Sequence, residues 1–138
     1  MKSFQLLSHI ADIRINAIGD TKQNLFKASL EALCKVAFKD YKNSNKNLDI
    51  TEFIYITAID ETCLLIDFLS EALTLMHINN ALYIHFEVEK MDENCLKGIL
   101  RGFHVDYFSV DIKAVTYHEA KIIMNKNGHF ESIFILDI

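Results

Sequence analysis

The stretch YIHFEVEKMDENCLKGILRGF, Tyr83–Phe103, decides the fold class of this chain. It contains two runs of β-branched, aromatic and other apolar residues, Tyr83–Val88 and Cys95–Phe103, which read as strands. The polar residues Asp92–Asn94 between them mark a turn. Three more strands are predicted downstream, over Val110–Tyr117, Ala120–Asn125 and Phe130–Leu136. The second half of the chain is therefore predicted to be a meander of strands.

Two helices are predicted upstream of the meander. Apolar residues recur at steps of three and four over Thr21–Phe38 and again over Glu61–Ile78, as on helices that bury one face. Asp20 or Thr21 can cap the first helix, and Asp60 can cap the second. Two shorter runs alternate with the two-residue period of a half-buried strand: Ile13–Ala17 and Leu48–Phe53.

This order of elements predicts an α+β fold, with two helices packed on one face of a mixed, largely antiparallel β-sheet. Asn127-Gly128 predicts a hairpin turn of type I′, which needs two residues that tolerate positive φ. The polar segment Lys39–Asn47 is expected to be an exposed loop and not a domain boundary. A chain of 138 residues is one domain's worth, so we expect a single domain over residues 1–138.

Composition narrows the class of protein. Half of the residues are hydrophobic (51%) and 24% are charged, which excludes a disordered chain. The net charge of −5 disfavours direct binding to nucleic acid, and no stretch is long enough to span a membrane. The three cysteines, Cys34, Cys63 and Cys95, form no metal-binding or disulfide pattern and sit among apolar neighbours. We expect buried, inert thiols in a protein of the reducing cytoplasm.

The generic motifs of enzymes are absent, among them phosphate-binding loops, nucleophile elbows and zinc-binding helices. The six histidines lie far apart along the chain. A metal-dependent hydrolase would need His9 or His118 as a base, and no motif orients either residue. We therefore expect a protein that is not an enzyme.

Carboxylates stand near both ends of the sequence. Asp12 lies beside the first strand, and Asp137-Ile138 follow the apolar run Ile133–Leu136 directly. If sheet pairing brings Asp12 beside that end, two side-chain carboxylates and a main-chain carboxylate converge, and they repel unless a cation or a proton offsets them. The alternative is structural: Asp12 merely leaves a strand, and Asp137-Ile138 is a frayed end.

Three sequence segments together resemble the archease family, and the resemblance spans the whole chain. They are HIADI at His9–Ile13, KAVTYH at Lys113–His118 and the final Asp137-Ile138. Shorter matches to the family pattern lie at Gly19–Lys22, Leu64–Leu73 and Arg101-Gly102.

The resemblance implies a small accessory protein of the RtcB-type RNA ligase, which joins RNA ends in tRNA splicing and RNA repair using GTP and manganese. An archease promotes guanylylation of the ligase's active-site histidine and multiple turnover, and is not itself the ligase. The resemblance also implies a site for a divalent hard cation at Asp12, Asp137 and Ile138, with calcium expected first and magnesium or manganese as alternatives. No direct contact with RNA or with a membrane is implied.

The chain departs from the usual family pattern at three positions. Ser8 and Ile10 stand where an acidic residue and a threonine are common, so support for Asp12 from those side chains is lost here. Phe68 stands where tryptophan is frequent, a change that should preserve packing. The rival function is a chaperone-like binding module that modulates another RNA-modifying enzyme. A large exposed apolar patch would favour that rival, and an acidic concavity at the joined ends would favour the ligase activator.

Overall fold

The computed structural model describes residues 1–5, 12–41 and 47–138. Within these ranges the chain forms two helices, α1 (Lys22–Ala37) and α2 (Glu61–Asn79). The strands are β1 (Asp12–Gly19), β2 (Ile50–Thr57), β3 (Ala81–Met91), β4 (Cys95–His104), β5 (Ala114–Met124) and β6 (Phe130–Asp137). Both predicted helices are confirmed, and their observed bounds differ from the prediction by at most one residue at each end.

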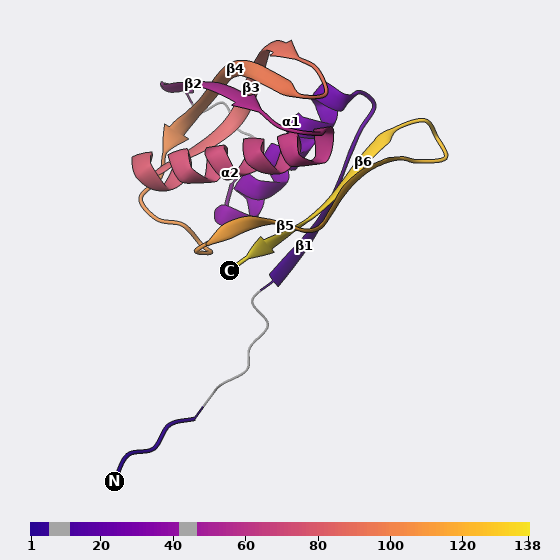
Figure 1. The fold of residues 1–138 in the computed structure, drawn as a ribbon. Coiled ribbons are helices and arrows are strands. Elements are labelled where there is room, and N and C mark those ends of the chain that lie inside the picture. Colours follow the sequence, from indigo (N-terminus) through magenta and orange to yellow (C-terminus); the bar gives the residue numbers. More distant parts are fainter. Residues whose placement is uncertain (6–11, 42–46) are drawn as a thin grey trace.

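The strands form two antiparallel sheets of three strands each, in the orders β1-β6-β5 and β2-β4-β3 (Figure 1). The α+β class is confirmed, and the single sheet that we expected is divided in two. Each helix contacts both sheets: α1 packs on β1 and β3, and α2 packs on β5 and β3. The consecutive residues Leu64, Leu65 and Ile66 are all buried, so α2 is covered on more than one side. A second sheet is needed because one sheet cannot bury apolar side chains on more than one side of this helix.

Both sheets and both helices share one core of buried side chains. Near its centre, the ring of Phe68 on α2 lies 5.7 Å from that of Phe26 on α1 and 4.7 Å from that of Phe86 on β3. All three phenylalanines are buried. Phe68 therefore joins the helices to the β2-β4-β3 sheet, as expected of a residue that replaces tryptophan without loss of packing.

The helix starts follow the predicted capping residues. Thr21 Oγ1 accepts a hydrogen bond from the Asn24 N–H at 3.0 Å, and Asp60 Oδ1 accepts one from the Cys63 N–H at 2.8 Å. Of the two candidates at α1, Thr21 is therefore the cap. Its neighbour Gly19 ends β1 so close to the helix that an added Cβ would lie 2.3 Å from the Leu25 nitrogen. This contact explains why glycine stands at the turn.

Two predictions about the last hairpin were wrong in detail. The strands expected at Val110–Tyr117 and Ala120–Asn125 are one strand, β5, whose pairing with β6 is interrupted between Thr116 and Lys121. Glu119, in the interruption, has a φ of 58°. The extra residues bulge out, so the strand continues instead of ending.

The turn between β5 and β6 is also not of type I′. Of the two turn residues, Gly128 has a positive φ, at 77°, and Asn127 does not. The Gly128 N–H donates to the Asn125 carbonyl at 3.1 Å, and the Asn125 N–H donates to the His129 carbonyl at 2.8 Å. These bonds fit a longer hairpin loop in which one left-handed glycine closes the turn.

The remaining expectations concern surface segments. The segment Lys39–Asn47 connects α1 to β2, and residues 42–46 of it lie outside the described ranges. Neither helix is long and apolar enough to cross a bilayer in the part of the chain that the structure describes.

Candidate metal site

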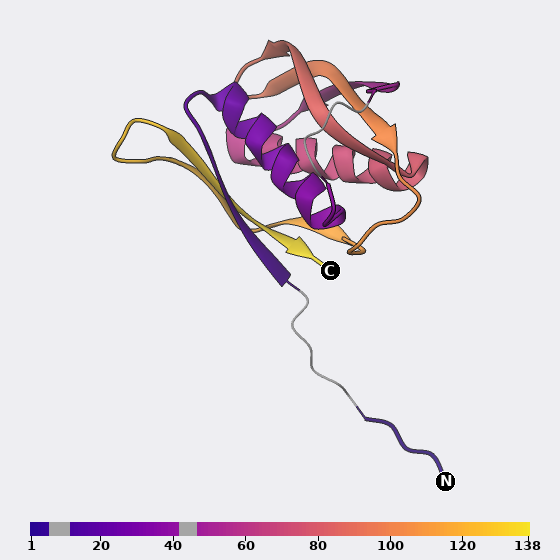
Figure 2. The ribbon, with the colours of Figure 1, turned by 180° about the vertical axis from the view of Figure 1, so that it is seen from behind.

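The first and last strands bring Asp12 and Asp137 together. β1 and β6 pair antiparallel with Asp12 directly opposite Asp137, so the start of β1 lies beside the end of β6 in both views (Figures 1 and 2). The side chains of directly opposite residues share a sheet face, with Cβ atoms about 5 Å apart. The prediction that these strands meet is confirmed. The frayed-end alternative is wrong for Asp137, which lies within β6.

The main chain at Asp137 is held from both sides. β1 pairs with it on one side, and on the other it lies opposite Ala114 of β5. The Lys113 N–H also donates to the Asp137 carbonyl oxygen at 2.7 Å. The side chain of Ile138 is partly buried and packs against the core. These contacts position Ile138 next to the two aspartates.

Among the described residues, no lysine, arginine or histidine forms an ion pair with Asp12 or Asp137. Arg14 lies two residues from Asp12 on the same face, and its Nη2 binds Glu119 Oε2 at 2.7 Å. Glu119 lies in the bulge of β5, so the bulge positions its carboxylate for the ion pair with Arg14. Sequence reasoning missed Arg14 as a neighbour of the site, although the alternation of β1 places it there.

The donor set where β1 begins beside the end of β6 contains oxygen atoms only. Among residues 1–5, 12–41 and 47–138, no three side chains of histidine, cysteine, aspartate or glutamate gather in a group able to hold a metal. The side chains of Asp12 and Asp137 and a main-chain oxygen of Ile138 would therefore have to supply the ligands together. Oxygen donors fit calcium, magnesium or manganese better than zinc or copper. The residues present thus fit a hard cation.

The other residues singled out from the sequence lie apart from this pair. His118 is highly exposed in the β5 bulge, with its Nε2 3.9 Å from Glu119 Oε1. The predicted strand Val110–Tyr117 would end just before His118, whereas the observed β5 continues through this residue. His9, Ser8 and Ile10 lie outside the described residues.

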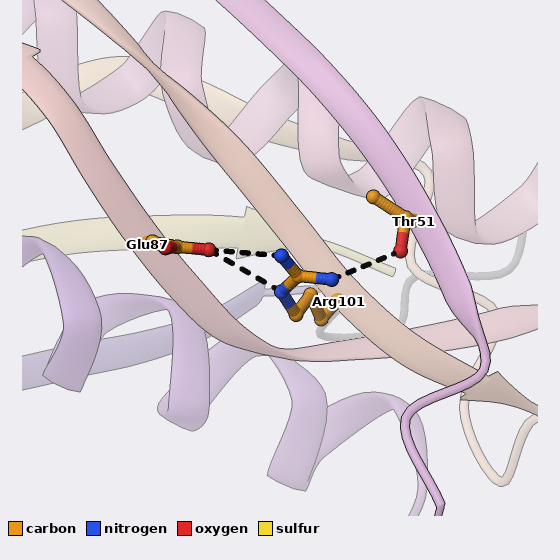
Figure 3. A network of polar contacts seen from close by, with 3 residues as sticks. All are labelled: Thr51, Glu87 and Arg101. Atoms are coloured by element: carbon orange, nitrogen blue, oxygen red, sulfur yellow. Dashed lines mark hydrogen bonds and ion pairs between the residues drawn. The ribbon is translucent and has the colours of Figure 1, made fainter.

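Arg101 has a role within the other sheet. From the middle strand β4 it reaches Glu87 on β3, with nitrogen-to-oxygen distances of 3.0 and 3.3 Å, and Thr51 on β2 at 3.4 Å (Figure 3). It links three neighbouring strands on the outer face of the sheet. The Arg101-Gly102 match therefore marks sheet architecture and not the candidate site.

The three cysteines differ from one another. Cys34 is buried, its Sγ donates to the Tyr83 carbonyl at 3.2 Å, and burial raises the pKa of its thiol to about 12. Cys63 and Cys95 are only partly buried, so the expectation of three buried thiols was wrong for these two. A hydrogen bond with Asp60 is the main cause that raises the pKa of the Cys63 thiol. A raised pKa keeps a thiol protonated and unreactive.

Known proteins resemble this chain over its whole length. The model of the Archease protein family matches residues 4–138. A protein archease from Pyrococcus furiosus is 31% identical over 146 residues, covering 100% of both chains. One from Methanosarcina barkeri is 28% identical over 145 residues, covering 99% of this chain and 97% of that one.

Two solved structures share the fold. A protein from Methanobacterium thermoautotrophicum superposes with a TM-score of 0.75 at 26% identity, covering 96% of each chain. A protein from Thermotoga maritima, described as an archease and possible chaperone, superposes with a TM-score of 0.68 at 16% identity, covering 100% of this chain and 99% of that one.

Proposed function

Because this chain belongs to the archease family, we propose that it is a metal-binding accessory protein that activates an RtcB-type RNA ligase in tRNA splicing or RNA repair. In this role it performs no catalysis itself. It promotes guanylylation of the ligase's histidine and allows the ligase to turn over repeatedly. We place this activity in the cytoplasm.

The single observation that carries the proposal is the pairing of Asp12 directly opposite Asp137. Like charges at directly opposite positions of a sheet destabilise it, and no basic side chain of the described residues forms an ion pair with either aspartate. A pair of strand ends that tolerates two such carboxylates is suited to binding a cation. Asp12, Asp137 and the main-chain carboxylate of Ile138 would hold it, with calcium as the first candidate and magnesium or manganese as alternatives.

A bound divalent ion would supply positive charge that neutralises these strand ends and can accept oxygen ligands from a partner. The overall charge of −5 supports a protein partner rather than RNA. A negative accessory protein is attracted to a basic enzyme that binds RNA, and it is repelled by the RNA backbone. We therefore propose that the ligase is contacted directly and that RNA is not.

The test compares Asp12→Ala and Asp137→Ala with the parent protein in a guanylylation assay of the RNA ligase from the same cell. Each variant should lose most of the stimulation and, in calorimetric titration, most of its calcium affinity. Folding stability should change by less than about 1 kcal/mol, because removing one carboxylate relieves repulsion across the strand pair.

Asp106→Ala is the matched control, since it removes an exposed carboxylate outside the candidate site. This variant should stimulate the ligase as the parent does. If Asp12→Ala and Asp137→Ala also stimulate fully, the metal-dependent activator hypothesis is wrong.

The second candidate is a chaperone-like module that modulates another RNA-modifying enzyme. Large apolar side chains exposed on and just after β2 favour it: Phe53 is 77% exposed, Tyr55 66% and Ile59 86%. The description of the Thermotoga maritima relative as a possible chaperone points the same way. Suppression of a client enzyme's aggregation that is lost in Phe53→Ser, yet unaffected by Asp12→Ala, would select this candidate over the first.

A further inference from the structure

The four edge strands of the two sheets are not equally protected against pairing with another chain. β3 pairs irregularly with β4 at two places, and β5 pairs irregularly with β6 at one. β1 carries Asp12 and Arg14. In contrast, β2 pairs with β4 in unbroken register over eight residues, ITEFIYIT, and contains Glu52 as its single charged residue. Bulges, charges and prolines are the usual protection of an edge, and β2 has the least.

No strand of the described residues pairs with the other edge of β2. Backbone N–H and C=O groups of alternate β2 residues therefore point away from β4. The outer face of the same strand exposes Phe53 and Tyr55, 77% and 66% respectively. An extended segment added at this edge would pair with those backbone groups and could cover both aromatic rings.

A hollow of about 400 Å³ lies between β2 and α2, lined on the β2 side by Tyr55, Ile56 and Thr57. Its charged lining residues are both acidic, Asp67 and Glu71 of α2. Tyr55, Thr57, Ser70 and Thr74, which all carry a hydroxyl group, also line it. Asp67 accepts a hydrogen bond from the Tyr117 hydroxyl, which leaves its negative charge in place, and Glu71 is exposed on the helix. A side chain entering this hollow would meet two negative charges and several hydroxyl oxygens.

We propose that β2 is a docking edge for an extended, basic segment of a partner protein, which adds to the β2-β4-β3 sheet as a fourth strand. Side chains alternate across a strand, so one set of the partner's residues faces α2 and its acidic residues Asp67 and Glu71, and the other lies beside Phe53 and Tyr55. Lysine or arginine in the first set pairs with Asp67 and Glu71, and apolar residues in the second set cover the aromatic rings.

Charge selects this occupant over a second copy of the same chain. An antiparallel pair of β2 strands centred on Ile54 would place Phe53 of one copy opposite Tyr55 of the other, which is favourable. The same arrangement would bring the acidic α2 flanks of both copies together, Asp67 and Glu71 against their equivalents. That repulsion disfavours self-pairing, whereas a basic segment is attracted to the same groups.

The test uses a capped peptide of alternating valine and lysine, matched in length to the eight residues of β2. Amide hydrogen exchange measured by NMR should slow at alternate residues of β2 when this peptide is added, because newly bonded N–H groups are protected. A peptide of alternating valine and glutamate should give no protection. N-methylation of the backbone nitrogens on one edge of the lysine-containing peptide should abolish binding. N-methylation on its other edge should leave binding unchanged, since only one edge of the peptide bonds to β2.

Glu71→Lys tests the charge argument and lies at an exposed helix position, so the fold should persist. It should weaken binding of the lysine peptide by roughly fivefold, because an attraction becomes a repulsion. The matched control is Glu31→Lys on α1, which changes the net charge equally outside the hollow and should leave binding near its parent value. If both variants weaken binding of the lysine peptide equally, overall charge and not the hollow causes the effect, and the proposed site is wrong.

A second outcome would also overturn the proposal. If the free protein sediments as a dimer whose β2 amides are already protected, and Phe53→Lys abolishes both properties, a second copy occupies this edge. The peptide experiment involves neither the ligase nor calcium. Its failure is therefore distinguishable from failure of the proposed activation.

Discussion

Two buried serines form the polar link between α1 and β6. Ser29 Oγ donates to the Leu25 carbonyl at 2.8 Å and lies 2.9 Å from Ser132 Oγ. Both residues are fully buried, and they are the buried polar residues of the described chain. With the Ser29 hydrogen directed at Leu25, Ser132 donates its own hydrogen to Ser29. Ser132 therefore depends on Ser29 more than Ser29 depends on Ser132.

This dependence predicts unequal costs of substitution. Ser29→Ala should destabilise the protein by about 1–3 kcal/mol, because it leaves the Ser132 hydroxyl buried without its partner. Ser132→Ala should cost less, since Ser29 keeps its bond to the Leu25 carbonyl. The double variant should cost less than the sum of the two. Urea denaturation of the three variants measures these differences, and a larger cost for Ser132→Ala would contradict the assigned direction of the bonds.

At the scale of elements, the two helices begin with different kinds of cap. The Thr21 hydroxyl does not titrate, whereas the Asp60 carboxylate does. Hydrogen bonding from the backbone N–H of Cys63 is the main cause that lowers the pKa of the Asp60 carboxyl below its usual value. The positive end of the helix dipole favours the same charged form. The start of α2 is therefore sensitive to acid, and the start of α1 is not.

We expect this difference to appear as a pH dependence of stability. A carboxyl whose folded-state pKa is lowered stabilises the protein above its unfolded-state pKa, and this stabilisation is lost as the pH falls through the lowered value. Asp60→Ser keeps a capping oxygen that does not titrate. The difference in free energy of unfolding between the parent and Asp60→Ser should be constant from pH 7 to about 5. Below about pH 4 the parent should lose stability relative to Asp60→Ser.

Thermal denaturation across this range checks the expectation. Thr21→Ser is the control, because the cap of α1 is a hydroxyl before and after the change. Its stability difference from the parent should not vary with pH. A parallel shift in both variants would show that the acid sensitivity arises elsewhere.

At the scale of the whole molecule, the pairing of β1 with β6 joins the two ends of the described fold. It places Asp12, Asp137 and Ile138 together at one end of this strand pair, and the proposed cation site needs the main-chain carboxylate of Ile138 as a ligand. An extension of a few glycine and serine residues after Ile138 converts that carboxylate into a neutral peptide group.

Calcium affinity should then fall by more than roughly tenfold, the size of effect seen when a metal site loses a supporting group. The melting temperature without calcium should not change, because the extension alters neither the Lys113–Asp137 bond nor the β1–β6 pairing. The same residues added before Met1 serve as the control. Unchanged calcium affinity after the extension at Ile138 would remove the main-chain carboxylate from the proposed ligands.

The resemblance to the archease family indicated the candidate metal site, which local sequence patterns alone did not decide. Asp12 and Asp137 could equally have been strand-end residues, and only the archease-like segments at both ends favoured a shared cation. Arg14 and the hollow between β2 and α2 were both missed. Each depends on residues of separate elements, such as Arg14 with Glu119 and Tyr55 with Glu71. Such neighbours leave no mark in a single sequence window.

The sequence by itself determined the local elements. Apolar spacing located α1 and α2, Thr21 and Asp60 marked their starts, and period-two runs located most strands, because these signals act between residues close in the chain. Only the tertiary structure decided that the strands divide into two sheets and that Asp12 faces Asp137. The pairing of β1 with β6 joins residues from opposite ends of the chain, and it depends on which faces the helices bury. The free energy of that burial is shared among many residues of the common core.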